Sequence, residues 1–451
     1  WMMLGRSSSS LGRALGGGQR RLLSAPSGLP SVVFIDGCRI PFQPSGTAYN
    51  DLMAYDLQRL ALKGLIKQTA LDPAHVDYVM CGTVLQEVKT ANIAREASVA
   101  AGFKVTTPSH TVTQACISAN QAICSGASLI MAGQFDVMVA GGVETFSDVP
   151  IRYSRPLRKA LIAAPKVKTG IPGYLKLLKG LKLKDLAPEA PSIANFATGE
   201  VMGHNADRLA DRFGITRQAQ DEFALRSHLN AAKAHADGIY DQEIVPVNGN
   251  SVEGGVRGDS VYDKLAKLKP AFVKPYGTVT AANSSYLTDG ASACLIMSEA
   301  KAKELGYKPK AYLRDYLFVS QDPFEDLLLG PAYAVYKLLK KTGLTLKDID
   351  VIEFHEAFAA QVLANVAALD SDVFAKKNLG GMDKVGAIPF EKFNIHGGSL
   401  AIGHPFGATG TRLVTTTANR LIREGGRFGI IAACADGGVG HAALIERYPG
   451  A

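Results

Sequence analysis

The sequence predicts an α/β protein made of two similar halves, with a long segment inserted in the first half. Short β-branched or apolar runs alternate with helix-length segments, which is typical of buried sheets covered by helices. Two of these stretches share one layout, and a region rich in proline and lysine interrupts the alternation between them. The chain has 451 residues, of which 47% are hydrophobic and 20% charged, enough for two or three domains and a large core.

The strands are expected in six runs, at residues 31–37, 76–82, 135–142, 291–298, 349–356 and 427–438. None approaches the roughly 18 apolar residues that a membrane-spanning helix requires. After Cys116, a helix-like stretch leads to a strand that ends in Gly141 and Gly142. Residues 407–438 repeat this order of small-residue turn, helix and strand ending in glycines. The repeat indicates an internal duplication, in which each half contributes a helix start and a strand end to one site.

These patterns divide the chain into four parts. The N-terminal half comprises residues 31–148 and 271–300, and the C-terminal half comprises residues 301–451. Residues 149–270 form the insertion, which contains many prolines and lysines. Residues 1–30 are rich in arginine and serine and contain no acid, which is the composition of a mitochondrial transit peptide; a disordered tail is the alternative.

The net charge of +8 is concentrated in two segments. Residues 1–30 contain four arginines and residues 149–184 contain ten lysines and arginines, and neither segment contains an acid. Subtracting these fourteen charges from +8 leaves −6 for the rest of the chain. The body is therefore mildly acidic, and no nucleic-acid partner is expected.

Six cysteines are spread thinly along the chain without a C-x-x-C pair: Cys38, Cys81, Cys116, Cys124, Cys294 and Cys434. This spacing argues against a disulfide framework or a structural zinc site, and favours a reducing compartment.

Cys116, in the stretch "QACISAN", is the first candidate for chemistry. A free cysteine is often simply a packed core residue. However, small residues surround Cys116, and it precedes an expected helix. The helix dipole would lower the thiol pKa from its usual value of about 8.5 and favour the nucleophilic thiolate.

Three further stretches contain reactive residues. Five glycines surround His404 in "HGGSLAIGHPFGATG", which holds an imidazole on a tight turn but matches neither a Walker nor a Rossmann motif. Cys434, in "CADGGVG", ends a buried strand, where catalytic groups of α/β proteins gather. His355 and Glu356, in "FHEAFAAQ", resemble the start of a zinc-protease helix, but Ala359 replaces the second histidine, so no metal site is expected.

In this order and at these separations, "QACISAN", "HEAFA", "GGSLAIGHPFGATG" and "CADGGVG" resemble the motifs of the thiolases, from about residue 31 to the C-terminus. His355, where most thiolases have asparagine, is similar to the mitochondrial long-chain branch of the family, whose members form the β subunit of a trifunctional complex. The resemblance implies a duplicated five-layer αβαβα fold with a loop domain in the first half. It also implies an acetyl-CoA C-acyltransferase of fatty-acid β-oxidation, which cleaves 3-ketoacyl-CoA with CoA.

The resemblance assigns five catalytic roles. Cys116 is the nucleophile that becomes the acyl thioester, His404 activates it and contributes to an oxyanion site, and Cys434 donates and accepts protons. His355 occupies the position that holds an oxyanion water, and Asp436 contributes a backbone oxyanion donor. Two of these residues depart from the family: Asp436 replaces a glycine and adds a carboxylate, and His355 could contact the oxygen directly.

The resemblance also identifies residues along the pantetheine path of CoA, which is a substrate rather than a cofactor. These are Met202 in the insertion, Ala281 and Ser285 in "GTVTAANSSYLTDG", and Phe358 opposite them. Ordinary packing is the alternative for each. No cofactor is expected.

The resemblance further implies a hetero-oligomer with a hydratase/dehydrogenase α subunit, a β–β dimer, and a peripheral position on the matrix face of the mitochondrial inner membrane. Within a basic segment at about 152–199, Tyr174, Leu177, Leu178 and Leu181 recur at helical spacing among lysines. This pattern is typical of an interfacial helix on anionic lipid. A solvated basic face or a funnel for the phosphates of CoA are the alternatives.

Three other functions compete with this interpretation. A short-chain acetoacetyl-CoA thiolase is disfavoured by His355 and by the basic insertion. A ketoacyl synthase would not need Cys434. A catalytically silent membrane scaffold would be supported by loss of Cys116, His404 or Cys434, but the sequence contains all three.

Overall fold

The computed structural model describes residues 29–381 and 383–451. The expected transit peptide, residues 1–30, lies outside these ranges except for Leu29 and Pro30.

The N-terminal half is a mixed sheet covered by helices. Its strands lie in the order β4-β3-β5-β8-β1; β3 is parallel to β4 and β5, whereas β8 is antiparallel to both β5 and β1. Its elements are β1 (Val32–Arg39), α1 (Ala54–Thr69), β3 (Tyr78–Gly82), α2 (Ile93–Ala101), β4 (Ser109–Val112), α3 (Ser118–Met131), β5 (Val137–Glu144) and β8 (Thr288–Ser298); the short β2 (Gln43–Pro44) pairs with β8.

The C-terminal half repeats this pattern. Its strands lie in the order β10-β11-β12-β9, with β10 parallel to β11 and the other neighbours antiparallel. Its elements are β9 (Ala311–Ser320), α10 (Gly330–Thr342), β10 (Val351–Phe354), α11 (Ala359–Leu369), α12 (Asp372–Asn378), α13 (Ser399–Ile402), α14 (Thr409–Arg423), β11 (Phe428–Ala435) and β12 (Val439–Arg447). Because α3–β5–β8 and α14–β11–β12 follow the same path, the duplication predicted from sequence is present in the fold.

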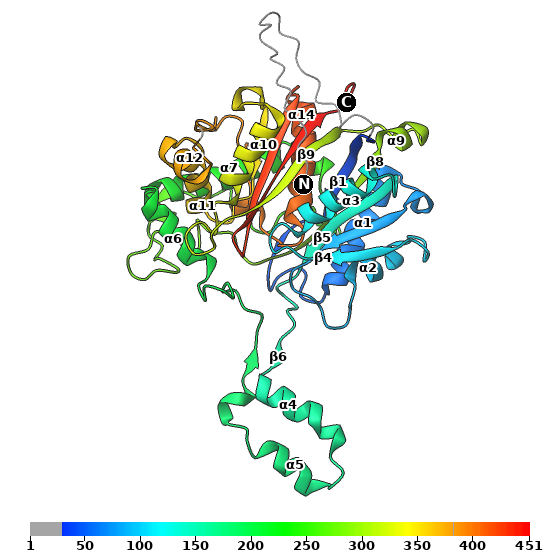
Figure 1. Cartoon of the computed structure of the whole chain (residues 1–451), viewed down its shortest axis with the longest axis vertical. Coiled ribbons are helices and arrows are strands. Elements are labelled where there is room, and N and C mark those ends of the chain that lie inside the picture. Colours follow the sequence, from blue (N-terminus) through cyan, green and yellow to red (C-terminus); the bar gives the residue numbers. More distant parts are fainter. Residues whose placement is uncertain (1–28, 382) are drawn as a thin grey trace, which may run out of the picture.

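The two halves enclose a central layer of helices. Strand β1 pairs with β9 and joins the half-sheets edge to edge, and α3 lies against α14 between them. The central core includes Ile123 of α3, Leu413 of α14, Phe34 of β1 and Ile431 of β11. Helices α1 and α2 cover the outer face of one half-sheet, and α10 and α11 cover the other (Figure 1). The five-layer αβαβα fold is therefore confirmed.

The insertion replaces a tight turn. In the C-terminal half, three residues (436–438) connect β11 to β12, whereas residues 145–287 connect β5 to β8. Helices α6 (Met202–Arg212), α7 (Arg217–Ala236) and α8 (Tyr262–Ala266) of this connection pack against the body, with α6 on α11 and α7 on α13. The remaining short helix, α9 (Glu299–Glu304), follows β8.

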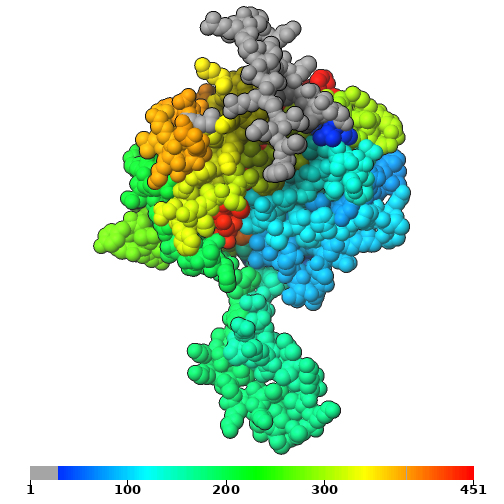
Figure 2. Space-filling view, viewed as in Figure 1, coloured from blue at the N-terminus to red at the C-terminus, as the bar shows by residue number. Residues whose placement is uncertain are grey.

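A helical hairpin projects from the body (Figures 1 and 2). It contains β6 (Arg152–Tyr153), α4 (Arg155–Ala163), α5 (Ile171–Leu178) and β7 (Pro188–Glu189). The expected apolar stripe is only partly correct, because α5 ends before Gly180 and Leu181 lies beyond the helix. Leu177 and Leu181 instead line the space between α4 and α5. Within the described ranges, no helix has the length and apolar character needed to cross a bilayer.

Gly142 and Gly407 bring a strand of one half and a loop of the other into backbone contact. A Cβ atom on Gly142, near the end of β5, would overlap the carbonyl oxygen of Gly407 and lie 2.7 Å from that of Gly82. Gly407 precedes α14, and Gly82 ends β3. Side chains at Gly142 would therefore separate the loop that contains His404 from the N-terminal half.

We predict that Gly142→Ala lowers the free energy of unfolding by about 1–3 kcal/mol, because an added methyl group overpacks this contact. Gly180→Ala is the matched control, since nothing lies within 4 Å of a Cβ at that exposed position. Urea denaturation of the two variants measures the difference. Equal stabilities would show that the loops can separate without cost.

Candidate active site

Cys116 lies on a strained turn just before α3. Ala115 has a positive φ of 45°, which is unusual for a residue with a side chain. Ser118 closes the turn: its hydroxyl accepts a hydrogen bond from Gln114 N (2.8 Å) and donates one to Ala115 O (2.7 Å). Cys116 is buried, at 4% exposure, and lines a cavity. The turn therefore presents the sulfur to an internal space.

The thiol of Cys116 has a raised pKa, contrary to the expectation from the helix dipole. Burial raises the pKa most, and negative charge on Cys434, Asp436 or Glu144 raises it further, whereas a hydrogen bond from the backbone N–H of Asp436 lowers it. Desolvation of the thiolate thus outweighs the helix terminus. In the resting state the sulfur is a protonated thiol, and it needs a base to become a nucleophile.

His404, in the loop before α14, is the residue that the sequence predicts as that base. Its Nδ1 lies 2.7 Å from the hydroxyl of Thr409, which donates its own proton to Pro405 O at 3.1 Å. Nδ1–H therefore donates to Thr409, and Nε2 keeps its lone pair. Burial, with positive charge on His355 and Arg412, holds the pKa of His404 well below its usual value, so the ring is neutral.

His355 has the opposite tautomer. Ser399 Oγ lies 3.0 Å from His355 Nδ1 and accepts a hydrogen bond from Arg412 Nη2 at 3.2 Å. Among the described residues, Nδ1 of His355 is the only acceptor that contacts the serine hydroxyl; we therefore assign the serine proton to Nδ1 and the ring proton to Nε2. Burial, followed by the charge of Arg412, lowers the pKa of His355 to about 3, so this ring is also neutral.

The two imidazoles face each other with ring centroids 4.0 Å apart. Both Nε2 atoms are buried, and neither has a hydrogen-bond partner among the described residues. One nitrogen offers a lone pair and the other an N–H group. Such a pair can remove a proton and stabilise a developing oxyanion.

Cys434 and Asp436 come from the other half of the duplicated fold. Cys434 is buried near the end of β11, and burial raises its pKa to about 12. Its thiol therefore holds a proton that it can donate. Asp436, in the turn that follows, lines the cavity beside Cys116. The structure thus brings Cys116, Cys434 and Asp436 to one place. Negative charge on Cys434 or on Asp436 accordingly raises the pKa of the Cys116 thiol.

The cavity at Cys116 has a volume of about 270 Å³ and a largely apolar wall. Met202, predicted from sequence, lines it. Sequence reasoning missed most of the other apolar lining residues, which are Val84, Leu85, Phe146, Val149, Ile193, Leu287 and Phe406. They come from five separate loops, so no local pattern could have grouped them.

The other predicted substrate residues lie on two paired segments, one of which follows His355 and the other of which bridges to His404 at Leu287. Ser285 N donates to Ala357 O at 2.9 Å, and the preceding Ser284 bridges to Phe358. Phe358 is buried and contacts Phe272 edge-on at 5.9 Å, whereas Ala281 is exposed. Three of the four predicted residues, Ala281, Ser285 and Phe358, are not among those lining the cavity at Cys116.

Glu144, also missed by sequence reasoning, connects the loops around the site. Its buried carboxylate accepts hydrogen bonds from Val84 N (3.1 Å), Leu85 N (2.9 Å) and Gly407 N (3.1 Å). Burial raises its pKa to about 7 despite these donors. The only sequence signal was an acid at the end of an apolar strand.

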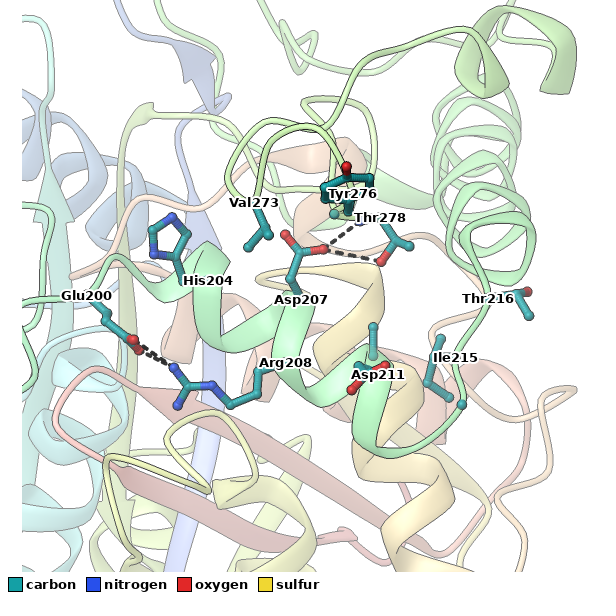
Figure 3. Close-up of a pocket in the computed structure, with 13 residues that line it drawn as sticks. Glu200, His204, Asp207, Arg208, Asp211, Ile215, Thr216, Val273, Tyr276 and Thr278 are labelled. Atoms are coloured by element: carbon teal, nitrogen blue, oxygen red, sulfur yellow. Dashed lines mark hydrogen bonds and ion pairs between the residues drawn. The ribbon is translucent and has the colours of Figure 1, made fainter.

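A larger hollow, of about 630 Å³, lies along α6 and contains none of the predicted residues (Figure 3). Glu200, His204, Asp207 and Arg208 line it, and Glu200 pairs with Arg208. Across the described ranges, histidine, cysteine and carboxylate side chains form no group of three that could hold a metal ion.

The five-layer fold and the matches to known domain families define a class of enzyme. The chain matches the thiolase N-terminal domain over residues 32–300 and the thiolase C-terminal domain over residues 307–447. The protein therefore belongs to the thiolase family and is an acyltransferase.

Its relatives narrow this class. The mitochondrial trifunctional enzyme subunit β of Bos taurus is 56% identical over 435 residues, which cover 95% of this chain and 91% of the bovine protein. A probable 3-ketoacyl-CoA thiolase of Caenorhabditis elegans is 53% identical, covering 94% of this chain and 96% of the worm protein. Human mitochondrial 3-ketoacyl-CoA thiolase, solved in complex with CoA, superposes with a TM-score of 0.79 at 30% identity, covering 93% of this chain and 98% of that one.

We predict that Cys116 remains a thiol near neutral pH, because burial raises its pKa and lowers that of His404. Thiolate ultraviolet absorbance should therefore not differ between the wild type and Cys116→Ala until the pH rises above the usual range for cysteine. Absorbance that Cys116→Ala already removes at neutral pH would instead reveal a resting thiolate–imidazolium pair.

Proposed function

We propose that this protein is the thiolase of a mitochondrial β-oxidation complex and cleaves long-chain 3-ketoacyl-CoA to acetyl-CoA and a shortened acyl-CoA. The proposal rests on two buried, protonated thiols, those of Cys116 and Cys434, and on the facing neutral imidazoles of His404 and His355, whose free Nε2 atoms are an acceptor and a donor. CoA acts as a substrate, and no cofactor or metal is required.

In the first half-reaction, Nε2 of His404 takes the proton of Cys116, and the sulfur attacks C3 of the substrate. Backbone N–H groups of Cys116 and Asp436 stabilise the tetrahedral oxyanion, and one such donor is typically worth roughly 3 kcal/mol of barrier. The C2–C3 bond then breaks, and its electron pair forms the acetyl-CoA enolate. Nε2–H of His404 and of His355 donate to the enolate oxygen, and Cys434 protonates C2.

In the second half-reaction, the Cys434 thiolate takes the proton of incoming CoA. The CoA sulfur attacks the acyl thioester, and Cys116 departs as a thiolate that regains its proton from His404. Each group thus returns to its starting protonation state. His355 donates directly in this scheme, because the contact from Ser399 holds its proton on Nε2.

The apolar cavity at Cys116 supports a long acyl chain as substrate. Each buried methylene contributes about 0.8 kcal/mol, or roughly a fourfold gain in kcat/KM, until the cavity is filled. Met202 lies in this cavity, and we propose Ala281, Ser285 and Phe358 as contacts for the pantetheine arm of CoA.

Turnover of 3-ketoacyl-CoA with CoA tests this assignment. We expect kcat/KM to rise from acetoacetyl-CoA to 3-ketohexadecanoyl-CoA. Cys434→Ser should lower kcat by about 10²–10⁴, because a serine hydroxyl is a much weaker proton donor. The control is Cys124→Ala, a buried cysteine within α3. A preference for acetoacetyl-CoA would favour the short-chain thiolase, and no turnover at all would favour the silent scaffold.

We further propose that the protein assembles as a β–β dimer with a hydratase/dehydrogenase α subunit, on the matrix face of the inner membrane. The name of its bovine relative, a trifunctional enzyme subunit, supports such a complex. The hairpin supports a membrane contact: Ile162, Ile171, Leu175 and Leu178 are between 53% and 76% exposed among its lysines. Arg152 and Arg158 pair with Glu189 at the base of the hairpin. Among the described residues, no ion pair involves a lysine of the hairpin.

Flotation with vesicles that contain anionic lipid tests the hairpin. Each basic residue near such a surface contributes about 1 kcal/mol, so Lys168→Glu, Lys176→Glu and Lys179→Glu together should weaken binding roughly 100-fold or more. The matched control changes Lys347, Lys376 and Lys377 to glutamate; these lysines are exposed on the body and alter the net charge equally. Equal binding of the two triple variants would exclude the hairpin as the docking surface.

A further inference from the structure

Asp436 places a carboxylate in the cavity that contains Cys116. Its backbone N–H lowers the pKa of the Cys116 thiol, but negative charge on its carboxylate raises that pKa. The side chain lies in the three-residue turn between β11 and β12 and lines the cavity. In the proposed mechanism, an uncompensated carboxylate here would oppose both the thiolate and the oxyanion. Something must therefore hold and partly neutralise it.

Asn195, in the insertion, contacts this carboxylate. Its Nδ2 donates to Asp436 Oδ1 at 2.8 Å across 241 residues of sequence. The amide cannot turn around, because its Oδ1 accepts from both Ala197 N and Thr198 N at 3.0 Å. Two backbone donors thus fix which end of the amide faces Asp436. Asn195 is buried, at 5% exposure, so water competes little for this bond.

The turn that contains Asn195 is itself anchored. Asn195 N donates to Glu200 O at 2.9 Å, and Gly199 N donates to Asn195 O at 2.9 Å. The carboxylate of Glu200 pairs with Arg208 on α6, as Figure 3 shows, and Arg208 also donates to Phe324 O. Residues 190–194, just before this turn, form one wall of the cavity at Cys116. The support is therefore firm and adjacent to the site.

We propose that Asn195 is a positioning residue for the catalytic site, acting through Asp436. By holding the carboxylate, it keeps the backbone N–H of Asp436 aligned with the oxyanion and moderates the negative charge beside Cys116. The insertion thus completes an oxyanion site whose other parts belong to the duplicated core. This inference rests on the proposed function, since it concerns the same reaction.

Exchange of the two side chains tests the proposal. Asn195→Asp keeps the acceptor for Ala197 N and Thr198 N but sets two carboxylates against each other. We expect kcat for 3-ketoacyl-CoA cleavage to fall roughly 10-fold or more, with KM little changed, because an oxyanion donor is displaced. Asp436→Asn alone keeps the contact, since the asparagine oxygen still accepts from Asn195, but it removes the charge that raises the pKa of Cys116, so iodoacetamide should alkylate Cys116 faster than in the wild type. The double variant Asn195→Asp with Asp436→Asn restores one donor and one acceptor and should regain most of the wild-type kcat.

A second readout does not depend on turnover. Alkylation of Cys116 by iodoacetamide at fixed pH should be slower in Asn195→Asp than in the wild type, because the added charge disfavours the thiolate, and should recover in the double variant. Wild-type kcat in Asn195→Asp, or failure of the exchange to rescue kcat and alkylation, would overturn the role of Asn195. An inactive wild type in which alkylation still responds to the exchange would overturn the proposed function instead.

Discussion

The close backbone contact between Gly142 and Gly407 is the constraint on which the site depends. It joins the end of β5 to the loop that precedes α14, so that a strand of one half meets a helix start of the other. Glu144 reinforces the contact by accepting hydrogen bonds from Gly407 N and from residues 84 and 85. These contacts set where the loop holding His404 lies relative to the half that holds Cys116. The candidate site therefore lies where the two halves of the duplicated fold meet.

The two halves of the duplicated fold differ most in one strand connection. The same strand connection is a three-residue turn in the C-terminal half and a segment of 145–287 in the N-terminal half. The short turn holds Asp436 beside Cys116, whereas the long connection supplies part of the cavity wall, Asn195 and the projecting hairpin. One half thus contributes a short turn, and the other supplies the contact that supports this turn and a hairpin that projects from the body.

The fold was predictable from the sequence, and the candidate reactive residues were identifiable there because each lies in a local motif. Cys116, His404 and Cys434 are recognisable within a few residues of chain, and the alternation of strands and helices needs no distant contact. Glu144 and Asn195 were missed because their roles depend on Gly407 and Asp436, 263 and 241 residues away. The predicted shift in the pKa of Cys116 was in the wrong direction. Burial, which the motif does not reveal, raises this pKa by more than the helix dipole lowers it. The predicted apolar stripe was wrong at Leu177 and Leu181, because α5 ends at Leu178 and both side chains line the space between α4 and α5.

In the proposed reaction, Cys116 carries the acyl group while the protonated thiol of Cys434 completes the cleavage. Mass spectrometry of the protein after incubation with 3-ketohexadecanoyl-CoA, without free CoA, tests this claim most directly. We expect a tetradecanoyl thioester on Cys116 and one acetyl-CoA released for each acylated site. No adduct, or an adduct on a cysteine other than Cys116, would contradict it.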